Sequence, residues 1–225
     1  MHRAAAAAYA APVPALRAVP PTVVLLVRHG RTPTTGSVLP GRASGLHLSD
    51  EGQREAQQAA TRIGALKRVA AVYASPLERA RETALPIARA CDRALRIERG
   101  LTECDFGEWT GLTLSRLRRR PEWRTVQRYP SGFRFPGGES FPEMQLRIVS
   151  AIGRLRQAHA GGTIVVVSHA DPIKAAVAHA LGIHLDLFQR IAIATASVTA
   201  IAYRSDGPVI LTVNSVAGEL GMLGP

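Results

Sequence analysis

Three apolar stretches of the sequence are each followed by side chains that can bind or transfer a charged group. These side chains are Arg28 and His29 after residues 22–27 ("TVVLLV"), Arg79 shortly after residues 69–74 ("VAAVYA"), and His169 after residues 163–168 ("TIVVVS"). Histidine can act as a nucleophile or carry a proton, and guanidinium groups bind phosphoryl oxygens through paired hydrogen bonds. The pattern favours chemistry on a phosphorylated molecule.

Each of these residues also has a purely structural interpretation. A single histidine at a strand end is usually a hydrogen-bonded structural residue, and an arginine in the first turn of a helix is usually solvated. The same combination after three separate apolar runs is hard to explain by coincidence. The other histidines, His2, His47, His159, His179 and His184, have no comparable context.

The elements that position these residues follow from hydrophobic periodicity. The three continuous apolar runs predict buried strands of a parallel sheet covered on both faces. Helices are predicted at residues 48–66, 75–90, 147–160 and 171–182, and a closing hairpin at residues 197–203 and 208–214. This is an α/β layered domain with a mostly parallel sheet. Ligands bind at the carboxyl edge of such sheets, where the histidines, the arginines and two helix N-termini would meet.

Local signals mark where these helices begin. We expect the first to be capped by Ser49 or Asp50, the second by a capping box of Ser75 with Glu78, and the last by Asp171. Prolines at positions 76 and 172 would occupy first helical positions, and the glycine at position 182 would end the last helix.

The chain divides into a tail and one domain. Residues 1–21, rich in alanine and proline, are predicted to be a flexible N-terminal tail or an artefact of an upstream start codon; a signal peptide is the less favoured alternative. Residues 22–225 form the single domain. Within it, residues 105–142 fit neither helical nor strand periodicity, and we expect them to be a small insertion over the active site that acts as a lid or sets substrate specificity.

Composition limits the choice of partner and compartment. The formal net charge of +11 suggests an anionic partner. Nucleic acid is disfavoured because no aromatic stacking platform or zinc finger accompanies the charge. No apolar run is long enough to span a membrane. Cys91 and Cys104 lack metal or redox spacing, which favours a reducing cytoplasm. His179 and His184 are five residues apart rather than four, so neither a metal nor another cofactor is expected.

Six ordered blocks of the sequence resemble the histidine phosphatase superfamily, which has the phosphoglycerate mutase-like fold. The blocks are "VRHGRT", "LHLSDEGQREA", "SPLERARETA", "LTECDFGEWTG", "PGGES" and "VVSHADPIKA", within residues 23–203. The resemblance implies a three-layer α/β/α domain.

The same resemblance implies roles for individual residues. His29 would be the nucleophile that forms a phosphohistidine, and Glu103 would be the acid that protonates the leaving group and then activates water. Arg28, Arg79 and His169 would hold the phosphoryl oxygens. We expect the two flanking cations to keep His29 neutral, and a protonated His169 would add positive charge at the transferring group.

Three positions depart from the family pattern. Arg31 replaces a common acidic residue and would favour a more anionic substrate. Thr35 replaces an asparagine that touches the phosphate, and Ala170 replaces a glycine from which only a backbone donor is needed.

The expected activity is metal-independent hydrolysis of small phosphomonoesters, of the acid phosphatase kind, on a small phosphorylated substrate. A phosphoglycerate mutase-type phosphomutase and a non-catalytic phosphate-binding domain remain alternatives. Six arginines could either grip an anionic substrate or form a solvated face: Arg116, Arg118, Arg119, Arg120, Arg124 and Arg128. Oligomeric state is left open, because the two apolar C-terminal strands offer an edge on which a homodimer could form.

Overall fold

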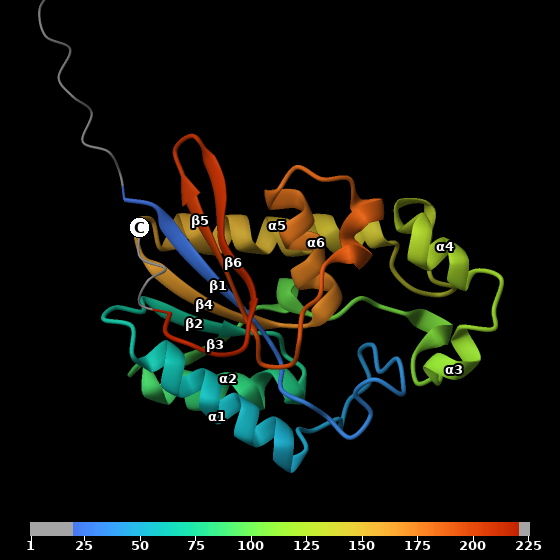
Figure 1. Ribbon diagram of the computed structural model, residues 1–225, viewed down its shortest axis with the longest axis horizontal. Coiled ribbons are helices and arrows are strands. Elements are labelled where there is room, and N and C mark those ends of the chain that lie inside the picture. The colour runs from blue at the N-terminus through green and yellow to red at the C-terminus, as the bar shows by residue number, and fades with distance from the viewer. Residues whose placement is uncertain (1–19, 221–225) are drawn as a thin grey trace, which may run out of the picture.

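A six-stranded sheet forms the centre of the molecule in a computed structural model that describes residues 20–220 (Figure 1). The strand order is β3-β2-β4-β1-β5-β6, with parallel pairing from β3 to β1 and antiparallel pairing of β5 with β1 and of β6 with β5. The strands are β1 (Thr22–Arg28), β2 (Ala71–Ala74), β3 (Leu95–Ile97), β4 (Thr163–Ser168), β5 (Val198–Arg204) and β6 (Gly207–Ser215). The mostly parallel sheet and the closing hairpin are confirmed.

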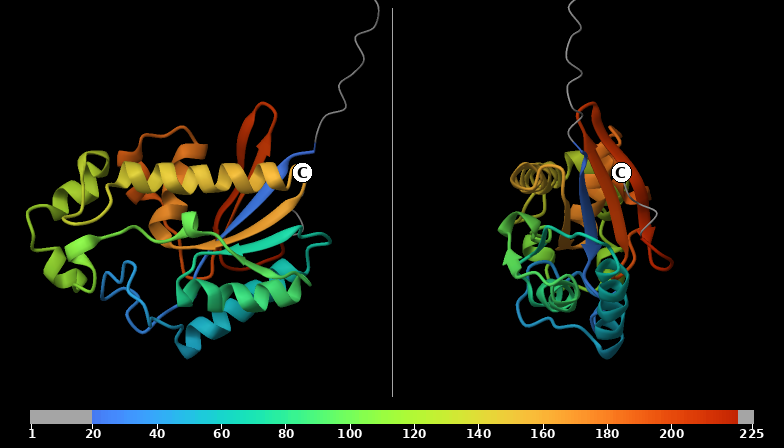
Figure 2. Two further views of the ribbon diagram at one scale, coloured as in Figure 1. Left: turned by 180° about the vertical axis from the view of Figure 1, so that it is seen from behind. Right: turned by 90° about the vertical axis from the view of Figure 1, so that its left-hand side faces the viewer.

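Helices cover both faces of this sheet, as the three-layer prediction requires (Figure 2). They are α1 (Asp50–Gly64) and α2 (Glu78–Ala90) on one face, and α5 (Phe141–Ala158) and α6 (Ala170–Ala180) on the other. Alternate residues of the central strands enter different cores: Val24 and Leu26 pack with α5 and α6, whereas Val23 and Leu25 pack with α1 and α2. The continuous apolar runs are therefore strands buried on both sides.

The strand β3 was not predicted, because its three residues are exposed or half-buried and carry too little apolar pattern. The remaining elements are short: η1 (Arg99–Leu101), η2 (Gly107–Trp109), α3 (Leu114–Leu117), α4 (Trp123–Arg128), η3 (Pro130–Gly132) and η4 (Leu185–Arg190). Within residues 20–220, no helix has the length and apolar character needed to cross a bilayer.

Two predicted helix caps are wrong. Helix α2 begins at Glu78, so Ser75 lies too far upstream to cap it; its hydroxyl instead contacts His169 Nε2 at 2.8 Å. Helix α6 begins at Ala170 with His169 as its N-cap residue, which places Asp171 inside the first turn. The predicted Ser49 cap is confirmed, since its side chain accepts a hydrogen bond from the Gly52 N–H.

The helix expected at residues 147–160 begins earlier, at Phe141, with a capping box formed by Ser140 and Glu143. Residues 105–140 before it are packed rather than loose. Their aromatic rings form a chain of edge contacts in which Phe135 lies 4.9 Å from Phe106 and 5.4 Å from Trp109 between ring centroids. This buried cluster fixes the segment against the domain, with α3 and α4 at one end of the molecule (Figure 1). A lid role for the segment stays a prediction.

The tail predicted for residues 1–21 lies outside the described residues except for its last two. Strand β1 begins at Thr22, as predicted.

Candidate active site

The parallel pairing of β1 with β4 brings the two predicted histidines together. Arg28 pairs with Ser168 in the sheet, and the His29 N–H donates to the Ser168 carbonyl at 2.9 Å. The rings of His29 and His169, which are distant in sequence, consequently lie 5.2 Å apart between centroids. The sheet register therefore creates the pair.

The glycine after His29 fixes the orientation of the imidazole. A Cβ on Gly30 would lie 2.5 Å from the Gly52 carbonyl oxygen at the start of α1, so only glycine allows this approach. The Gly30 N–H donates to Thr83 Oγ1 at 2.9 Å, and its carbonyl accepts from His29 Nδ1 at 2.7 Å. Because a carbonyl can only accept, Nδ1 carries the proton and Nε2 keeps its lone pair.

His29 is also held in its neutral form. Burial lowers its pKa well below the usual 6.5, and the positive charges of Arg79 and Arg28 lower it further. The expectation that these cations disfavour protonation is confirmed in direction, although burial is the larger cause. A neutral ring with a free Nε2 lone pair has the form that a nucleophilic imidazole requires.

His169 does not meet the condition under which it would add positive charge to the site. Burial and the charge of Arg79 lower its pKa well below 6.5, so it is neutral. Ser75 Oγ accepts from the Leu77 N–H at 3.4 Å and can donate its own proton to His169 Nε2. His169 Nδ1 then carries a proton and has no partner among the described residues.

Arg28 and Arg79 add further unused donors at the same place. Arg79 has no exposed surface; its Nη2 donates to the Gly41 carbonyl at 2.7 Å, while its Nε and Nη1 are buried without a partner in the described structure. Arg28 Nη1 donates to the Ile193 carbonyl at 2.8 Å, and its Nε is also unpartnered there. Buried donors are normally satisfied, so these three unpaired guanidinium nitrogens, together with His169 Nδ1 where it carries the proton, indicate a site for an anion.

Glu103 supplies the carboxyl group of the site. Burial, reinforced by the charge of Asp171, raises its pKa from 4.5 to about 7, against the opposing effect of Arg79. Its Oε1 accepts the Cys104 N–H at 2.9 Å. A carboxyl group with this pKa can both donate and accept a proton near neutral pH.

A charged network that sequence reasoning missed holds the backbone of Glu103. Its carbonyl accepts from Arg42 Nε at 2.9 Å and from Arg147 Nη2 at 3.2 Å. Glu139 binds both arginines, with 2.8 Å from Oε1 to Arg42 Nη2 and 2.8 Å from Oε1 to Arg147 Nε. Glu139 lies in the "PGGES" block, but its long-range partners could not be inferred from that motif.

A cavity of about 430 Å³ opens onto these groups. Its lining includes Arg28, His29, Thr35, Glu103 and Ala170, five of the seven predicted site residues. The other two, Arg79 and His169, are fully buried beside them. The structure thus brings the predicted residues to one place at the carboxyl edge of the sheet.

The sequence did not indicate which charged residues line the cavity. Arg31 is exposed, pairs with Glu51 at 3.2 Å and does not line the cavity, but its positive charge helps to lower the pKa of Arg28. The preference for a more anionic substrate stays a prediction. Asp171 and Lys174 do line the cavity and pair with each other at 3.3 Å. None of the six arginines of residues 116–128 belongs to the lining.

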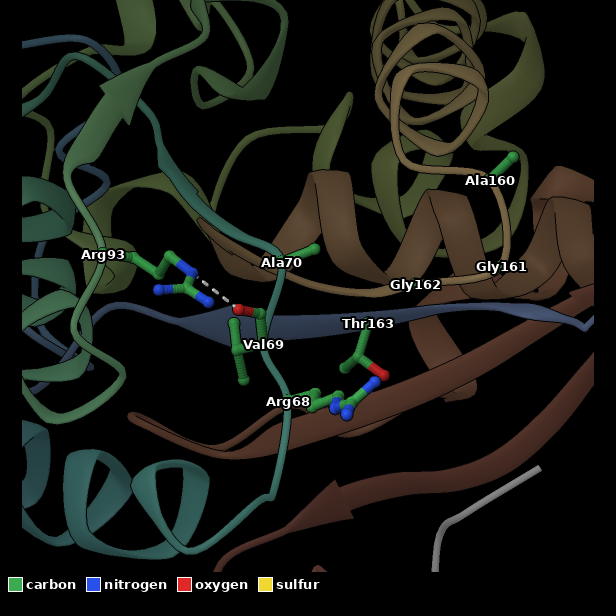
Figure 3. A pocket seen from close by; sticks show the side chains of 8 residues that line it. All are labelled: Arg68, Val69, Ala70, Arg93, Ala160, Gly161, Gly162 and Thr163. Carbon is green, nitrogen blue, oxygen red and sulfur yellow. Dashed lines mark hydrogen bonds between the residues drawn. The ribbon is translucent and has the colours of Figure 1, made fainter.

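A second cavity lies at the opposite end of the sheet, before the first residues of β2 and β4 (Figure 3). Arg68 and Arg93 line it, and the Arg93 side chain donates to the Val69 carbonyl at 2.9 Å. None of the described residues that line it is a histidine or carries a carboxylate, so this lining lacks the groups for acid, base or nucleophilic catalysis. Among the described residues, no cluster of three or more histidine, cysteine or acidic side chains could hold a metal ion.

A layered α/β fold with a buried histidine pair at its carboxyl edge defines a phosphoglycerate mutase-like domain. Residues 24–216 match the family model described as histidine phosphatase superfamily (branch 1), and the chain belongs to that superfamily. The resemblance drawn from the sequence blocks is confirmed.

Individual relatives are similar over most of this chain. Bifunctional protein Rv2228c of Mycobacterium tuberculosis is 33% identical over 201 residues, covering 89% of this chain but only 55% of the relative. This chain thus spans about half the length of that relative. Phosphoserine phosphatase 1 of Hydrogenobacter thermophilus is 31% identical over 204 residues, which cover 85% of this chain and 91% of the relative.

Solved structures agree with the fold. A phosphoserine phosphatase mutant from Entamoeba histolytica in complex with phosphoserine superposes with a TM-score of 0.78 at 26% identity, covering 87% of this chain and 98% of that one. YhfR of Bacillus stearothermophilus gives a TM-score of 0.81 at 24% identity, with coverage of 87% and 98%.

Proposed function

We propose that this protein hydrolyses small phosphomonoesters without a metal ion, through a phosphohistidine on His29. The observation that carries the proposal is the arrangement of the site: a neutral imidazole with a free Nε2 lone pair, beside three buried guanidinium nitrogens and His169 Nδ1 that have no partner among the described residues. A tetrahedral dianion would satisfy those donors. Phosphoryl transfer needs this combination of positioning and charge stabilisation more than it needs elaborate covalent chemistry.

In the first half-reaction, His29 Nε2 attacks phosphorus and the ester P–O bond breaks. The leaving oxygen takes the proton of Glu103, whose pKa of about 7 keeps part of the population protonated at neutral pH. The alcohol departs and the phosphoryl group stays on nitrogen. Arg28, Arg79 and His169 stabilise its equatorial oxygens with the donors that are unpaired in the free protein.

In the second half-reaction, water attacks the phosphohistidine. Glu103, now a carboxylate, takes a proton from that water, the P–N bond breaks, and inorganic phosphate leaves with neutral His29 restored. The group thus acts once as an acid and once as a base, as its pKa near neutrality allows.

Two features argue against the alternative functions. A mutase would need cationic groups to grip a second charged end of its substrate, yet the six arginines of residues 116–128 do not line the cavity. A pure binding domain has no use for a carboxyl group with a raised pKa beside a neutral histidine. The phosphatase names of relatives support hydrolysis.

The test is phosphate release from 4-nitrophenyl phosphate in excess EDTA, comparing wild type with His29→Ala. We expect metal-independent turnover that the variant loses, and an acid-labile phosphoenzyme in wild type after rapid quenching. A folded wild type that releases no phosphate would contradict the proposal. Turnover that depends on a bisphosphorylated primer and conserves total phosphate ester would indicate a mutase instead.

A further inference from the structure

Beyond the phosphoryl end, the active-site cavity has apolar walls, and the polar residues Asp171, Lys174 and Gln189 also line it. The apolar walls come from three segments: residues 38–40, the pair Phe106 and Leu114, and residues 191–193. These wall residues are neutral, and all of them except Ala192 are buried or half-buried. The part of a substrate that extends from the phosphate would therefore contact hydrocarbon.

Hydrogen bonds hold two of these walls together. The Leu39 N–H donates to the Leu112 carbonyl at 2.9 Å, and the Leu39 carbonyl accepts from the Gly111 N–H at 2.8 Å. The Leu114 N–H donates to the Ser37 carbonyl at 2.8 Å. The third wall is anchored where Arg28 Nη1 donates to the Ile193 carbonyl. The apolar surface is thus formed before a substrate binds.

Among the described residues, two cationic side chains line the cavity, Arg28 at the phosphoryl end and Lys174. Of these two, Lys174 already has a carboxylate partner. Lys174 Nζ lies 3.3 Å from Asp171 Oδ1 and donates to Gln189 Oε1 at 3.1 Å, and both members of the ion pair are less than a fifth exposed. Two of the three N–H donors of this lysine are thus used, and a substrate carboxylate that approached the third would lie beside the negative charge of Asp171.

We propose that the preferred substrates are phosphomonoesters whose organic group is uncharged and largely apolar, such as alkyl or aryl phosphates, rather than esters that carry a carboxylate. This proposal rests on the hydrolytic function proposed above. Each methylene group buried against the walls gains about fourfold in binding. An unpaired carboxylate placed there loses hydration without compensation.

The experiment compares kcat/KM for esters whose leaving groups are all alkanols, so that leaving-group chemistry does not dominate. The series is 3-phenylpropyl phosphate, propyl phosphate, O-phosphoserine and 3-phosphoglycerate. We expect 3-phenylpropyl phosphate to exceed both acids by about tenfold or more, in line with several buried methylene equivalents. Equal or higher values for either acid would overturn the proposal.

Activity towards 4-nitrophenyl phosphate distinguishes a failure of the proposed substrate class from a failure of the proposed phosphatase function. If that ester is hydrolysed but the acids are preferred, the substrate class is wrong and the proposed phosphatase function stands. If no ester in the whole set is hydrolysed, both are wrong.

A wall variant provides an independent test. Leu114→Ser should lower kcat/KM for 3-phenylpropyl phosphate by about tenfold, the loss expected for the buried carbons it removes. The inhibition constant of vanadate, which occupies only the phosphoryl end, should stay unchanged and report that the variant is folded. Leu146→Ser, at a leucine 69% exposed on α5, is the matched control. An unchanged preference in Leu114→Ser would contradict the assignment of this wall.

Discussion

The raised pKa of Glu103 makes a quantitative prediction about stability. In the folded protein the pKa of the Glu103 carboxyl group is about 7, compared with the ordinary value of 4.5 that represents the unfolded chain. Below about pH 4.5 the group is protonated in both folded and unfolded chains and contributes nothing. As the pH rises from there through 7, the folded state retains a proton that the unfolded state releases, so the free energy of unfolding falls.

The size of this loss follows from the two pKa values. At about 1.36 kcal/mol per pH unit, the interval from 4.5 to about 7 corresponds to about 3 kcal/mol once the pH exceeds both values. Glu103→Gln removes the ionisation while keeping an oxygen that can accept the Cys104 N–H. The variant should therefore gain about 3 kcal/mol over wild type between about pH 4.5 and pH 8.

The assay is urea denaturation of both proteins across that pH range, with the difference in unfolding free energy plotted against pH. Glu108→Gln, at an exposed position whose side chain has no hydrogen bond among the described residues, is the control and should give a flat difference. A flat difference for Glu103→Gln as well would refute the raised pKa, and with it the dual acid and base role.

Three further predictions concern activity and the anion site. Arg79→Met should raise stability by about 1–2 kcal/mol in phosphate-free buffer, since it removes a buried cation with two unpaired donors, and should lower kcat/KM by about 10²–10³-fold; a less stable variant in urea melts would contradict this. Glu139→Gln should weaken the hold of Arg42 and Arg147 on the Glu103 carbonyl. It should lower kcat/KM for alkyl phosphates more than for 4-nitrophenyl phosphate, because the 4-nitrophenolate leaving group needs less help from an acid. The control Glu108→Gln should have neither effect. The value of kcat/KM for an alkyl phosphate should fall above about pH 7, as Glu103 loses its proton, and should stay high below pH 6.5, because the pKa of His29 is lowered. Glu103→Gln should not show the fall above pH 7. A fall in kcat/KM at the ordinary pKa of histidine would contradict the neutral His29.

Much of the active site could be located from the sequence because its residues are adjacent to strong local signals. His29 and His169 directly follow continuous apolar runs, and the end of a buried parallel strand is a fixed place in an α/β fold. Glu103 has no such periodic signal; only its place in an ordered block indicated a role.

The two wrong helix caps were predicted for side chains that can also hydrogen-bond or pair with residues distant from the helix end or elsewhere in the first turn. Ser75 fits a capping box by sequence, yet its hydroxyl contacts a histidine from another strand. Asp171 fits a cap by sequence but pairs with Lys174. Local sequence shows which hydrogen bonds a residue is able to make, and tertiary contacts decide which of them it makes.

The sequence by itself determined the layered fold, the strand ends that carry the two histidines, and the membership of residues 28, 29, 79, 103 and 169 in one site, because hydrophobic periodicity and short motifs are local properties. The neutral state of His29 was expected from its neighbouring cations, but only the tertiary structure showed that burial is its main cause, that the pKa of Glu103 is raised, and which residues line the cavity. Burial lowers the pKa of His29 and raises that of Glu103, and both shifts depend on the packing of distant segments around them. The same packing leaves the arginines of residues 116–128 outside the cavity lining and places several apolar side chains in it.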